Sequence, residues 1–429
     1  MFMKVLVIGG GGREHALAWQ CSKFDTVSHV FVAPGNAGTQ LETKLTNINI
    51  LTDDIVGLIN FVKTNQVDLT IVGPEAPLVI GIVDRFQYEG LAIFGPTKAA
   101  SQLEWSKVFC KYFLERHNIP TAHYGVFTEV ELAIEYVKNQ GTPIVIKADG
   151  LASGKGVIIA YTQFEAKNVI IDMLQGNCFG KAGLCVVIEE FLSGEEASFI
   201  VMCDGKNILP MATSQDHKAR DNDDKGPNTG GMGAYSPTPI ITDEIFQSVM
   251  DTIIYPTVNA MAEEGNIYTG FLYVGLMIDQ DNNFKVLEYN CRFGDPETQP
   301  IMMRLKSNLA DLCLLATQQS LDQANIKWDE RICLGVVLAA KGYPNTYNTN
   351  ELIILPEDSQ DTKVFHAGTK LENGKVFSSG GRVLCVTALG ENIYSAQTKA
   401  YKLVKRINWD GSYYRDDIGF KAIKRLYSI

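Results

Sequence analysis

The first hundred residues constrain the fold most, because short apolar runs alternate there with helix-like segments. Residues 3–8 (MKVLVI) form a continuous apolar run bounded by glycines, which is typical of a strand buried on both faces of a parallel sheet. The alternation predicts βαβ units and an open parallel sheet within residues 1–121. Strand-and-turn patterns recur at 29–38, 67–78 and 92–96, and helical patterns lie between them at 15–24, 53–66 and 83–90.

Three more units are predicted after this sheet. Residues 122–194 carry two helices and two strands, at 129–140, 143–150, 163–174 and 185–192. Residues 195–328 carry two strands, a helix and a hairpin, at 196–205, 207–213, 243–264 and 271–290. Residues 329–429 read as a small α+β domain in which we identify no chemistry, with strands at 335–344, 363–370 and 380–390. The predicted fold class is therefore a multidomain mixture of α/β and α+β units.

Length and composition exclude several classes of protein. A chain of 429 residues is too long for one core, and its 46% hydrophobic and 20% charged residues are ordinary for a globular protein. The net charge of −11, with both signs interspersed, argues against a dedicated nucleic-acid binder. Nine scattered cysteines without a CxxC pair indicate a reducing compartment. No apolar stretch reaches 18 residues, so we expect a cytoplasmic protein that binds no membrane.

Two glycine-rich loops suggest nucleotide or phosphate binding. The loop at 9–16 (GGGGREHA) precedes a helix, whose N-terminal N–H groups could bind an anion. It fails the dinucleotide fingerprint, because the third glycine would fall at Glu14 or His15 and the next strand lacks the acidic residue. A phosphate loop and a tight turn without a ligand both remain open.

The second loop, at 148–157 (ADGLASGKGV), is not a P-loop. The spacing from Gly150 to Gly154 is one residue short, and Gly156 follows Lys155 where a hydroxyl residue is needed. A mobile lid that closes over phosphates is the better interpretation. Lys147, at the end of the preceding apolar strand, is either a phosphate contact or an exposed strand end.

Polar side chains interrupt two later strands. The segment at 187–198 (VIEEFLSGEEAS) is either a solvated linker or a connection that binds a base and a ribose. In the strand at 284–290 and its extension, Glu288, Asn290 and Arg292 occupy every second position, so they should share one face with Phe284 and Val286. A solvated edge strand and a ligand-binding face are both compatible with this pattern.

The order of these segments resembles the ATP-grasp superfamily and, within it, the glycinamide ribonucleotide synthetase family. The resemblance covers the whole chain and implies an N-terminal βαβ domain, a two-lobed ATP-grasp unit and a small C-terminal α+β domain. It rests on eight motifs, which occur in this order along the chain: GGREHALAW, APGNAG, VGPEAPL, SQDHK, GPNTGGMGAYSP, NCRFGDPETQ, FHAGT and GGRVLCVTALG.

The resemblance implies an ATP-dependent ligase of purine biosynthesis. Such an enzyme joins glycine to 5-phosphoribosylamine through glycyl phosphate and yields glycinamide ribonucleotide, ADP and phosphate. It would use Mg²⁺, with Mn²⁺ as an alternative, and act as a monomer without nucleic acid. Another carboxylate–amine ligase of the superfamily is the nearest rival, and a nucleotide-binding regulator without chemistry is a rival from a different class.

The resemblance also implies site residues. The metal ligands would be Glu288 and Asn290, and the catalytic residues Lys147, Arg292 and Asp295. Nucleotide contacts would come from Lys107, Lys147, Gly154, Lys155, Gly156, Glu189, Glu190, Phe191, Leu192 and Glu196. Substrate contacts would come from Gly11, Gly12, Arg13, Glu75, Asp216, His217, Lys218, Asn228, Gly230, Arg292 and Asp295.

Two departures from the family pattern affect these expectations. Ala219 stands where the family has an arginine after DHK, and Arg220 follows one position later. The strand at 273–278 offers no acid, so metal binding would depend on Glu288, Asn290 and the nucleotide. Among the histidines, His15 either contacts substrate or caps its loop, and we expect His217 rather than His29, His117, His123 or His366 to be functional.

Overall fold

The structure, a computed structural model, describes residues 2–150, 156–176 and 180–427. Its N-terminal unit is the predicted open parallel sheet, which has five strands in the order β3-β2-β1-β4-β5; the short strand β3 was not predicted. The order reverses between β1 and β4, and loops at such a reversal form ligand sites in open α/β sheets. The strands are β1 (Met3–Gly9), β2 (Val27–Pro34), β3 (Leu45–Asn47), β4 (Leu69–Val72) and β5 (Ile93–Phe94); the helices are α1 (Gly12–Ser22), α2 (Ala37–Leu41), α3 (Ile55–Asn65), α4 (Glu75–Val79) and α5 (Ile82–Tyr88).

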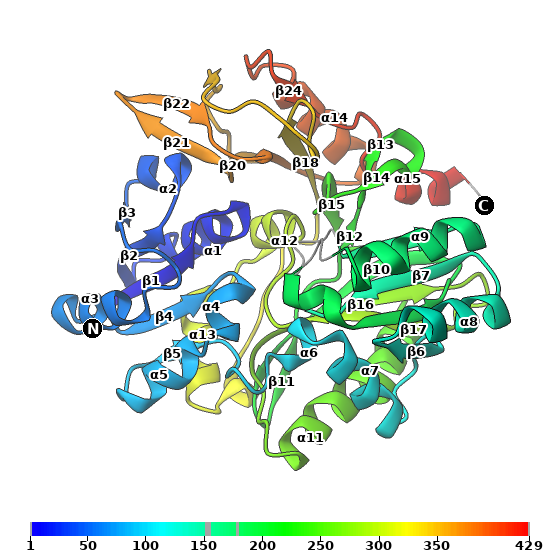
Figure 1. Cartoon of the computed structure of the whole chain (residues 1–429). Helices are drawn as coiled ribbons and strands as arrows, with labels where there is room; N and C mark the ends of the chain where they lie inside the picture. The colour runs from blue at the N-terminus through cyan, green and yellow to red at the C-terminus, as the bar shows by residue number, and fades with distance from the viewer. Residues whose placement is uncertain (1, 151–155, 177–179, 428–429) are drawn as a thin grey trace.

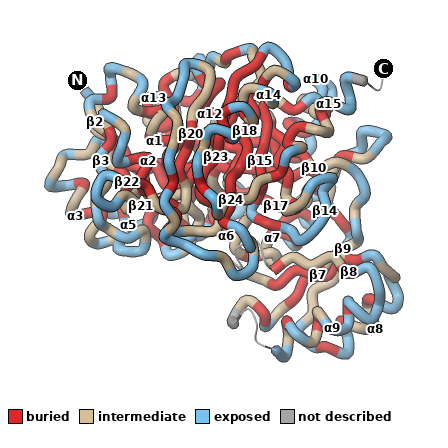
Figure 2. Tube along the Cα trace, turned by 90° about the horizontal axis from the view of Figure 1, so that it is seen from above, coloured by how far each residue is buried: buried red, intermediate tan, exposed pale blue. Residues whose placement is uncertain are grey.

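The small lobe is a four-stranded sheet of order β6-β9-β7-β8 with two helices packed against it. Figure 1 shows it on the right of the molecule, away from the N-terminal sheet, and it stands apart from the buried centre in Figure 2. Its elements are β6 (Tyr124–Phe127), α8 (Val130–Gln140), β7 (Ile144–Ala148), β8 (Val157–Ala160), α9 (Gln163–Leu174) and β9 (Val186–Glu190). This lobe is preceded by two helices, α6 (Gln102–Trp105) and α7 (Lys107–Arg116).

The large lobe is built on the antiparallel sheet β11-β10-β16-β17, in which β17 is an edge strand. A helical segment covers this sheet, with a π-helical stretch at 250–254 between two α-helices. The main elements are β10 (Glu195–Asp204), β11 (Ile208–Pro210), α10 (Asp243–Val249), α11 (Tyr255–Glu263), β16 (Thr269–Ile278), β17 (Phe284–Asn290), α12 (Thr298–Arg304) and α13 (Leu309–Thr317). Four short strands lie between β11 and α10 in the chain, namely β12 (Gln215–Asp216), β13 (Ala219–Asp221), β14 (Lys225–Asn228) and β15 (Gly233–Ser236).

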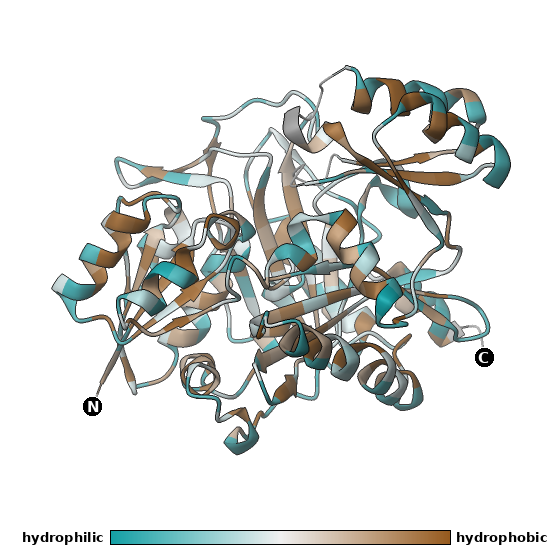
Figure 3. Ribbon diagram, turned by 60° about the horizontal axis from the view of Figure 1, so that its bottom comes forward, coloured by the Kyte–Doolittle hydropathy of each residue, from teal (hydrophilic) through white to brown (hydrophobic). Residues whose placement is uncertain are grey.

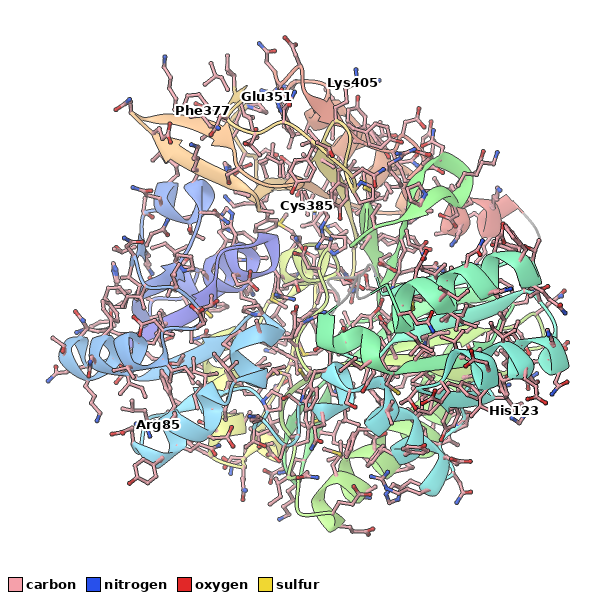
Figure 4. The ribbon with its side chains drawn as sticks, viewed as in Figure 1. Arg85, His123, Glu351, Phe377, Cys385 and Lys405 are labelled. Carbon is pink, nitrogen blue, oxygen red and sulfur yellow. The ribbon has the colours of Figure 1, made fainter. Side chains whose placement is uncertain are left out.

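The C-terminal residues share a sheet with the large lobe. Its order is β12-β15-β18-β23-β20, so strands from both sides of the expected boundary at 328/329 pair with one another. Figure 4 labels Cys385 of β23 near the centre of the molecule and Glu351, Phe377 and Lys405 along the outer side. The remaining elements are β18 (Ile332–Ala340), β19 (Leu352–Ile353), β20 (Thr362–His366), β21 (Thr369–Glu372), β22 (Lys375–Ser378), β23 (Arg382–Gly390), α14 (Ile393–Val404), β24 (Ser412–Tyr413) and α15 (Phe420–Tyr427).

The N-terminal sheet is buried on both faces, as its continuous apolar strands predict. Leu6 and Ile8 of β1 join one hydrophobic core, which includes Tyr289 of β17. Val5 and Val7 join another core, which extends to α12 and to β20 and β23. In Figure 3 the strands are mostly hydrophobic, whereas the helices turn hydrophilic residues outward. Within the described residues, no helix is long and apolar enough to cross a membrane.

Candidate active site

The polar face of β17 is the centre of the candidate site. Glu288, Asn290 and Arg292 alternate with Tyr289 and Cys291, which are only 2% and 1% exposed in the core. Gly275 stands opposite Glu288 on β16 and leaves space for its carboxylate. The Glu288 side chain remains 41% exposed and has Lys218 beside it. The face is therefore lined by cationic groups, which a simple solvated edge would not require.

A β-bulge at Leu287 sets this arrangement. Leu276 and Gly275 of β16 pair with Val286 and Glu288, so Leu287 has no partner in the β16–β17 ladder. The extra residue turns Val286 into the core, where it is 0% exposed. The prediction that Phe284 and Val286 share a face with Glu288 is therefore wrong, because strict alternation does not continue through a bulge. The freed carbonyl of Leu287 accepts a hydrogen bond from Lys147 Nζ at 3.1 Å.

Three lysines meet where the small lobe faces β17. Lys147 Nζ lies 2.9 Å from Glu189 Oε1, and Lys111 Nζ lies 3.6 Å from the other oxygen of the same carboxylate. Lys107 Nζ donates to Gly150 O at 2.8 Å. Burial lowers the pKa of Lys107. Burial also acts to lower the pKa of Lys147, but Glu189 and Glu288 together oppose it and the pKa is raised. The structure thus brings the two predicted phosphate lysines, Lys107 and Lys147, to the same side of the site.

The hinge residues of β9 divide into two groups. Glu189 is 2% exposed and its carboxylate is taken by lysines, so its side chain positions Lys147 and does not face a nucleotide. Glu190 pairs with Lys285 of β17 and accepts the His123 N–H at 3.2 Å. Phe191 is 37% exposed and Leu192 is half-buried, which leaves both available to a base.

Glu288 has the electrostatic environment of a metal ligand. Desolvation alone would raise the pKa of its carboxyl, but the Lys218 and Lys147 ammonium groups lower that pKa to about 2. Asn290 Nδ2 is 3.4 Å from Glu288 Oε1, so the two proposed ligands are adjacent. Among the described residues, no three His, Cys, Asp or Glu side chains gather as a metal site. The donor set here is one carboxylate and one amide oxygen, which suits a hard cation that is bound mainly by phosphate.

Lys218 joins the metal face to the predicted ribose-binding acid. Its Nζ lies 2.6 Å from Glu196 Oε1 and 3.4 Å from Glu288 Oε1. The two carboxylates outweigh burial and raise the pKa of Lys218 well above its ordinary value. Asp216 on β12 is buried beside this group, and desolvation raises the pKa of its carboxyl well above the usual range although Lys218 opposes the rise.

The glycine-rich loop after β1 is filled by its own glutamate. Glu14 Oε2 accepts the Gly11 N–H at 2.7 Å, and Arg13 Nε lies 2.6 Å from Glu14 Oε1. Gly9 has φ +126°, and a Cβ there would lie 2.3 Å from Glu14 Cγ. The carboxylate takes an N–H that a phosphate would need and also repels anions. This geometry favours the tight-turn alternative at Gly11.

Arg292 lies between two carboxylates from different elements. Its Nε is 3.2 Å from Glu75 Oε2 on α4, and its Nη2 is 2.8 Å from Glu104 Oε1 on α6. Burial would raise the pKa of Glu75, but Arg292 and Arg13 lower it to about 2. The structure thus brings together Glu75, Arg13 and Arg292, three of the predicted substrate contacts.

Asp295 is held by two residues that the sequence analysis did not identify. Gln299 Nε2 donates to Asp295 Oδ1 at 2.8 Å, and a Cβ on Gly12 would lie 2.5 Å from that same Nε2. Arg382 Nη2 is 3.4 Å from Asp295 Oδ2, while its Nη1 donates to the carbonyls of Asp295 and Gly230. An arginine of the C-terminal unit therefore joins two predicted substrate loops.

Family models match the chain in three consecutive segments. The N-domain model of phosphoribosylglycinamide synthetase matches residues 3–104, the ATP-grasp (A) domain model residues 105–298 and the C-domain model residues 333–421. The chain belongs to the phosphoribosylglycinamide synthetase family. The resemblance seen in the sequence motifs is thereby confirmed.

Relatives of this phosphoribosylglycinamide synthetase family member match over its full length. It is 62% identical to phosphoribosylamine–glycine ligase of Vibrio parahaemolyticus over 425 residues and covers 99% of both chains. It is also 62% identical to the ligase of Salmonella typhi over 426 residues, again with 99% coverage of each. The crystal structure of phosphoribosylamine–glycine ligase from Thermotoga maritima superposes with a TM-score of 0.82 at 33% identity and covers 97% of this chain and 100% of that chain.

A more distant structure shows the common fold alone. The biotin carboxylase domain of Hydrogenobacter thermophilus 2-oxoglutarate carboxylase has a TM-score of 0.73 at 14% identity, and the match covers 96% of this chain and 92% of that chain. The predicted fold class is confirmed: a parallel N-terminal sheet, an antiparallel ATP-grasp region and a C-terminal unit of mixed structure.

Two histidines of this phosphoribosylglycinamide synthetase family member, His217 and His15, contact groups of the protein through both ring nitrogens. His217 is 0% exposed; its Nε2 accepts the Gly419 N–H at 3.1 Å, and its Nδ1 lies 3.3 Å from Gly233 O. His15 Nδ1 accepts the His366 N–H at 2.9 Å, and its Nε2 lies 3.4 Å from Glu42. These contacts argue against the predicted substrate role of His217. They join His15 to β20 and to Glu42 rather than to its own loop.

The remaining predicted residues are placed unevenly. Gly154 and Lys155 lie outside the described residues, while Gly156 is described and buried. Asn228 is exposed at the end of β14. Arg220, which follows Ala219, pairs with Asp221.

Glu104 and Arg382 were missed because each lies far in sequence from the residue it holds: 187 positions separate Glu104 from Cys291, and 87 separate Arg382 from Asp295. Gln299 lay inside a recognised motif (GDPETQ), so its closeness to Asp295 was the only available signal.

Proposed function

We propose that this chain is a phosphoribosylamine–glycine ligase, which uses ATP to join glycine to 5-phosphoribosylamine. The products are glycinamide ribonucleotide, ADP and phosphate, in purine biosynthesis. The observation that supports this most is 62% identity to such ligases across 99% of the chain. Lys147 contacts β17 beside Glu288, and this arrangement of a lysine and a carboxylate supports binding of ATP phosphates and a cation.

The first step activates glycine. Its carboxylate is a poor electrophile, because the negative charge repels a nucleophile. Attack of a carboxylate oxygen on the γ-phosphorus of ATP forms glycyl phosphate and releases ADP. Lys107 and Lys147 would neutralise the phosphates, and Arg292 would stabilise the transferred phosphoryl group or the glycine carboxylate, so catalysis is mainly positioning and charge stabilisation.

The second step forms the amide bond. The amine of 5-phosphoribosylamine attacks the carbonyl of glycyl phosphate, the nitrogen loses a proton, and phosphate leaves. No covalent bond to the protein is needed. Asp295 would orient the substrates at this end of the site, where Gln299 and Arg382 fix its position. Glu196 and the hinge residues Phe191 and Leu192 would hold the nucleoside part of ATP.

A divalent cation fits the oxygen donors of β17. Glu288 and Asn290 would hold Mg²⁺, with Mn²⁺ as an alternative, and the bound cation would neutralise charge on the ATP phosphates. Glu288 is suited to this role because the surrounding lysines keep its carboxyl ionised.

Organisation and location complete the proposal. The chain would act in the cytoplasm as a monomer that binds no nucleic acid. Its proposed units are residues 1–121, 122–194, 195–328 and 329–429, with the last two joined by one sheet. Light scattering of the purified protein tests the monomer.

ADP release measures the proposed function directly. Purified protein with ATP and Mg²⁺ should release ADP in proportion to glycinamide ribonucleotide only when glycine and 5-phosphoribosylamine are both present. Other amino acids or amines in place of either substrate serve as controls. ADP release that does not depend on glycine and 5-phosphoribosylamine would contradict the proposal, and ADP release with another substrate pair would favour the rival carboxylate–amine ligase.

A further inference from the structure

Glu104 is a buried carboxylate to which the reaction scheme assigns no role. It lies on the short helix α6, between the N-terminal sheet and the small lobe, and its side chain is 7% exposed. Its Oε2 accepts the Cys291 N–H at 2.7 Å and lies 2.9 Å from Cys291 Sγ. Its Oε1 lies 2.8 Å from Arg292 Nη2. One carboxylate therefore holds both the backbone and the guanidinium at the end of the polar face of β17.

The two acidic partners of Arg292 differ in their accessibility. Glu75 is 29% exposed and 3.2 Å from Nε, whereas Glu104 is 7% exposed and 2.8 Å from Nη2. Glu104 has two further contacts with Cys291 that fix its orientation. An incoming anion can displace the more exposed and more distant partner at lower cost, because that carboxylate regains hydration when it leaves.

Charge balance also favours an exchange. With both carboxylates ionised, Arg292, Glu75 and Glu104 together carry one net negative charge, which would repel a carboxylate or a phosphoryl group; Arg13 nearby is paired with Glu14. Release of Glu75 makes the remaining pair neutral and frees Nε–H to donate to the substrate anion. Loss of Glu104 would instead leave Arg292 free to turn toward Glu75.

We propose that Glu104 is the positioning residue of Arg292, and that Glu75 is the exchangeable partner which the substrate anion replaces. This inference rests on the proposed function, since it takes the anion to be the glycine carboxylate or the phosphoryl group transferred to it. Glu104 itself would not touch the substrate. It acts through Arg292, whose guanidinium it keeps in place along the face that begins with Glu288 and Asn290.

Two substitutions at Glu104 separate positioning from simple packing. Glu104→Gln keeps the size and an oxygen for the Cys291 N–H, but it places an uncharged amide against Arg292. Glu104→Asp keeps the charge but shortens the side chain by one methylene. A positioning role therefore predicts greater damage from Gln than from Asp, whereas a packing role predicts the opposite order, because the isosteric side chain fills the site.

Steady-state kinetics provide the main test. For Glu104→Gln we expect kcat to fall about 100-fold, the scale of one lost transition-state charge contact, while KM for ATP changes less than about twofold. The kcat of Glu104→Asp should be about tenfold higher than the kcat of Glu104→Gln. Cys291→Ala is the matched control: it removes only the thiol contact of the same carboxylate and should keep more than about a third of wild-type kcat.

The crystal structure of Glu104→Gln supplies a readout that does not depend on turnover. Arg292 should leave its present position and pair more closely with Glu75. An unmoved Arg292, activity above half of wild type in Glu104→Gln, or a Glu104→Asp protein less active than Glu104→Gln would each overturn the inference. A wild-type protein without glycine-dependent ADP release would instead overturn the proposed function, and the position of Arg292 in the variant would still decide the inference.

Discussion

At the scale of single residues, Glu288 is the acidic side chain of the polar face on β17. Glu288→Gln keeps the size of the side chain but removes its charge. If Glu288 binds Mg²⁺, turnover should fall by roughly two orders of magnitude, comparable to the loss of a transition-state charge contact. Because the variant binds the cation more weakly, raising the Mg²⁺ concentration should restore part of the activity. Initial rates of ADP release across a Mg²⁺ titration measure both effects.

A matched control for this substitution lies in the same hairpin. Asp281 is exposed in the turn between β16 and β17, so Asp281→Asn also removes one carboxylate. It should change stability and turnover little, within the ~0.5 kcal/mol typical of surface substitutions. Lys285 is unsuitable as a control, because it pairs with Glu190 of the hinge. Near-normal activity of Glu288→Gln at limiting Mg²⁺ would contradict the metal assignment.

At the scale of elements, the bulge in β17 links strand geometry to phosphate binding. Val286 and Glu288 already pair with neighbouring residues of β16, so deletion of Leu287 would leave a regular ladder with the same faces. It would also remove the carbonyl that Lys147 Nζ contacts at 3.1 Å. A hydrogen bond to a charged group contributes about 1.5–3 kcal/mol. We therefore expect a folded variant whose KM for ATP is raised tenfold or more.

Leu287→Ala is the control for this deletion, since it keeps the bulge and its carbonyl. Its KM for ATP should stay within about twofold of wild type, and circular dichroism should show that both variants are folded. A deletion variant with unchanged KM for ATP would show that the bulge does not position Lys147.

The same strand shows how far local patterns reach. Alternation correctly predicted that Glu288, Asn290 and Arg292 share a face, because they lie on one side of the bulge. It failed for Val286, since one unpaired residue reverses the alternation and leaves no mark in composition. The helix predicted at 163–174 is α9, with the same bounds in the structure, where Thr162 and Glu165 form a capping box at its start.

At the scale of the whole molecule, the sequence predicted units better than the contacts between them. Parallel strands in the N-terminal unit follow from apolar runs and intervening helices. The pairing of β15 with β18 does not, because it joins residues about a hundred positions apart without a local signal. Arg382 was missed for the same reason, because β23 comes near Asp295 only through long-range strand pairing in this sheet.

Another long-range contact makes the stability of the molecule depend on pH. His217 on the large lobe accepts the N–H of Gly419 at the start of α15, 202 positions away. Burial, with smaller contributions from Arg415 and Lys421, lowers the pKa of His217 to about 3. Burial likewise lowers the pKa of His366 to about 3. Both rings are therefore neutral in the folded protein well below the pH at which an exposed histidine becomes charged.

The sign of the pH effect follows from this difference. Below the unfolded pKa of 6.5, the histidine binds a proton in the unfolded chain but not in the folded chain. Its contribution to stability is therefore complete above pH 6.5 and is lost as the pH falls toward 3. At pH 5.5 each such histidine lowers the free energy of unfolding by about 1.4 kcal/mol relative to neutral pH. His217→Gln keeps an acceptor oxygen for the Gly419 N–H but does not titrate. Urea unfolding at pH 7.5 and 5.5 should show a pH-dependent loss of stability that is about 1.4 kcal/mol smaller in this variant, whereas the exposed His123→Gln should keep the wild-type difference. An equal loss in wild type and His217→Gln would mean that His217 is already charged in the folded protein, and that its contact with the C-terminal helix does not require the neutral ring.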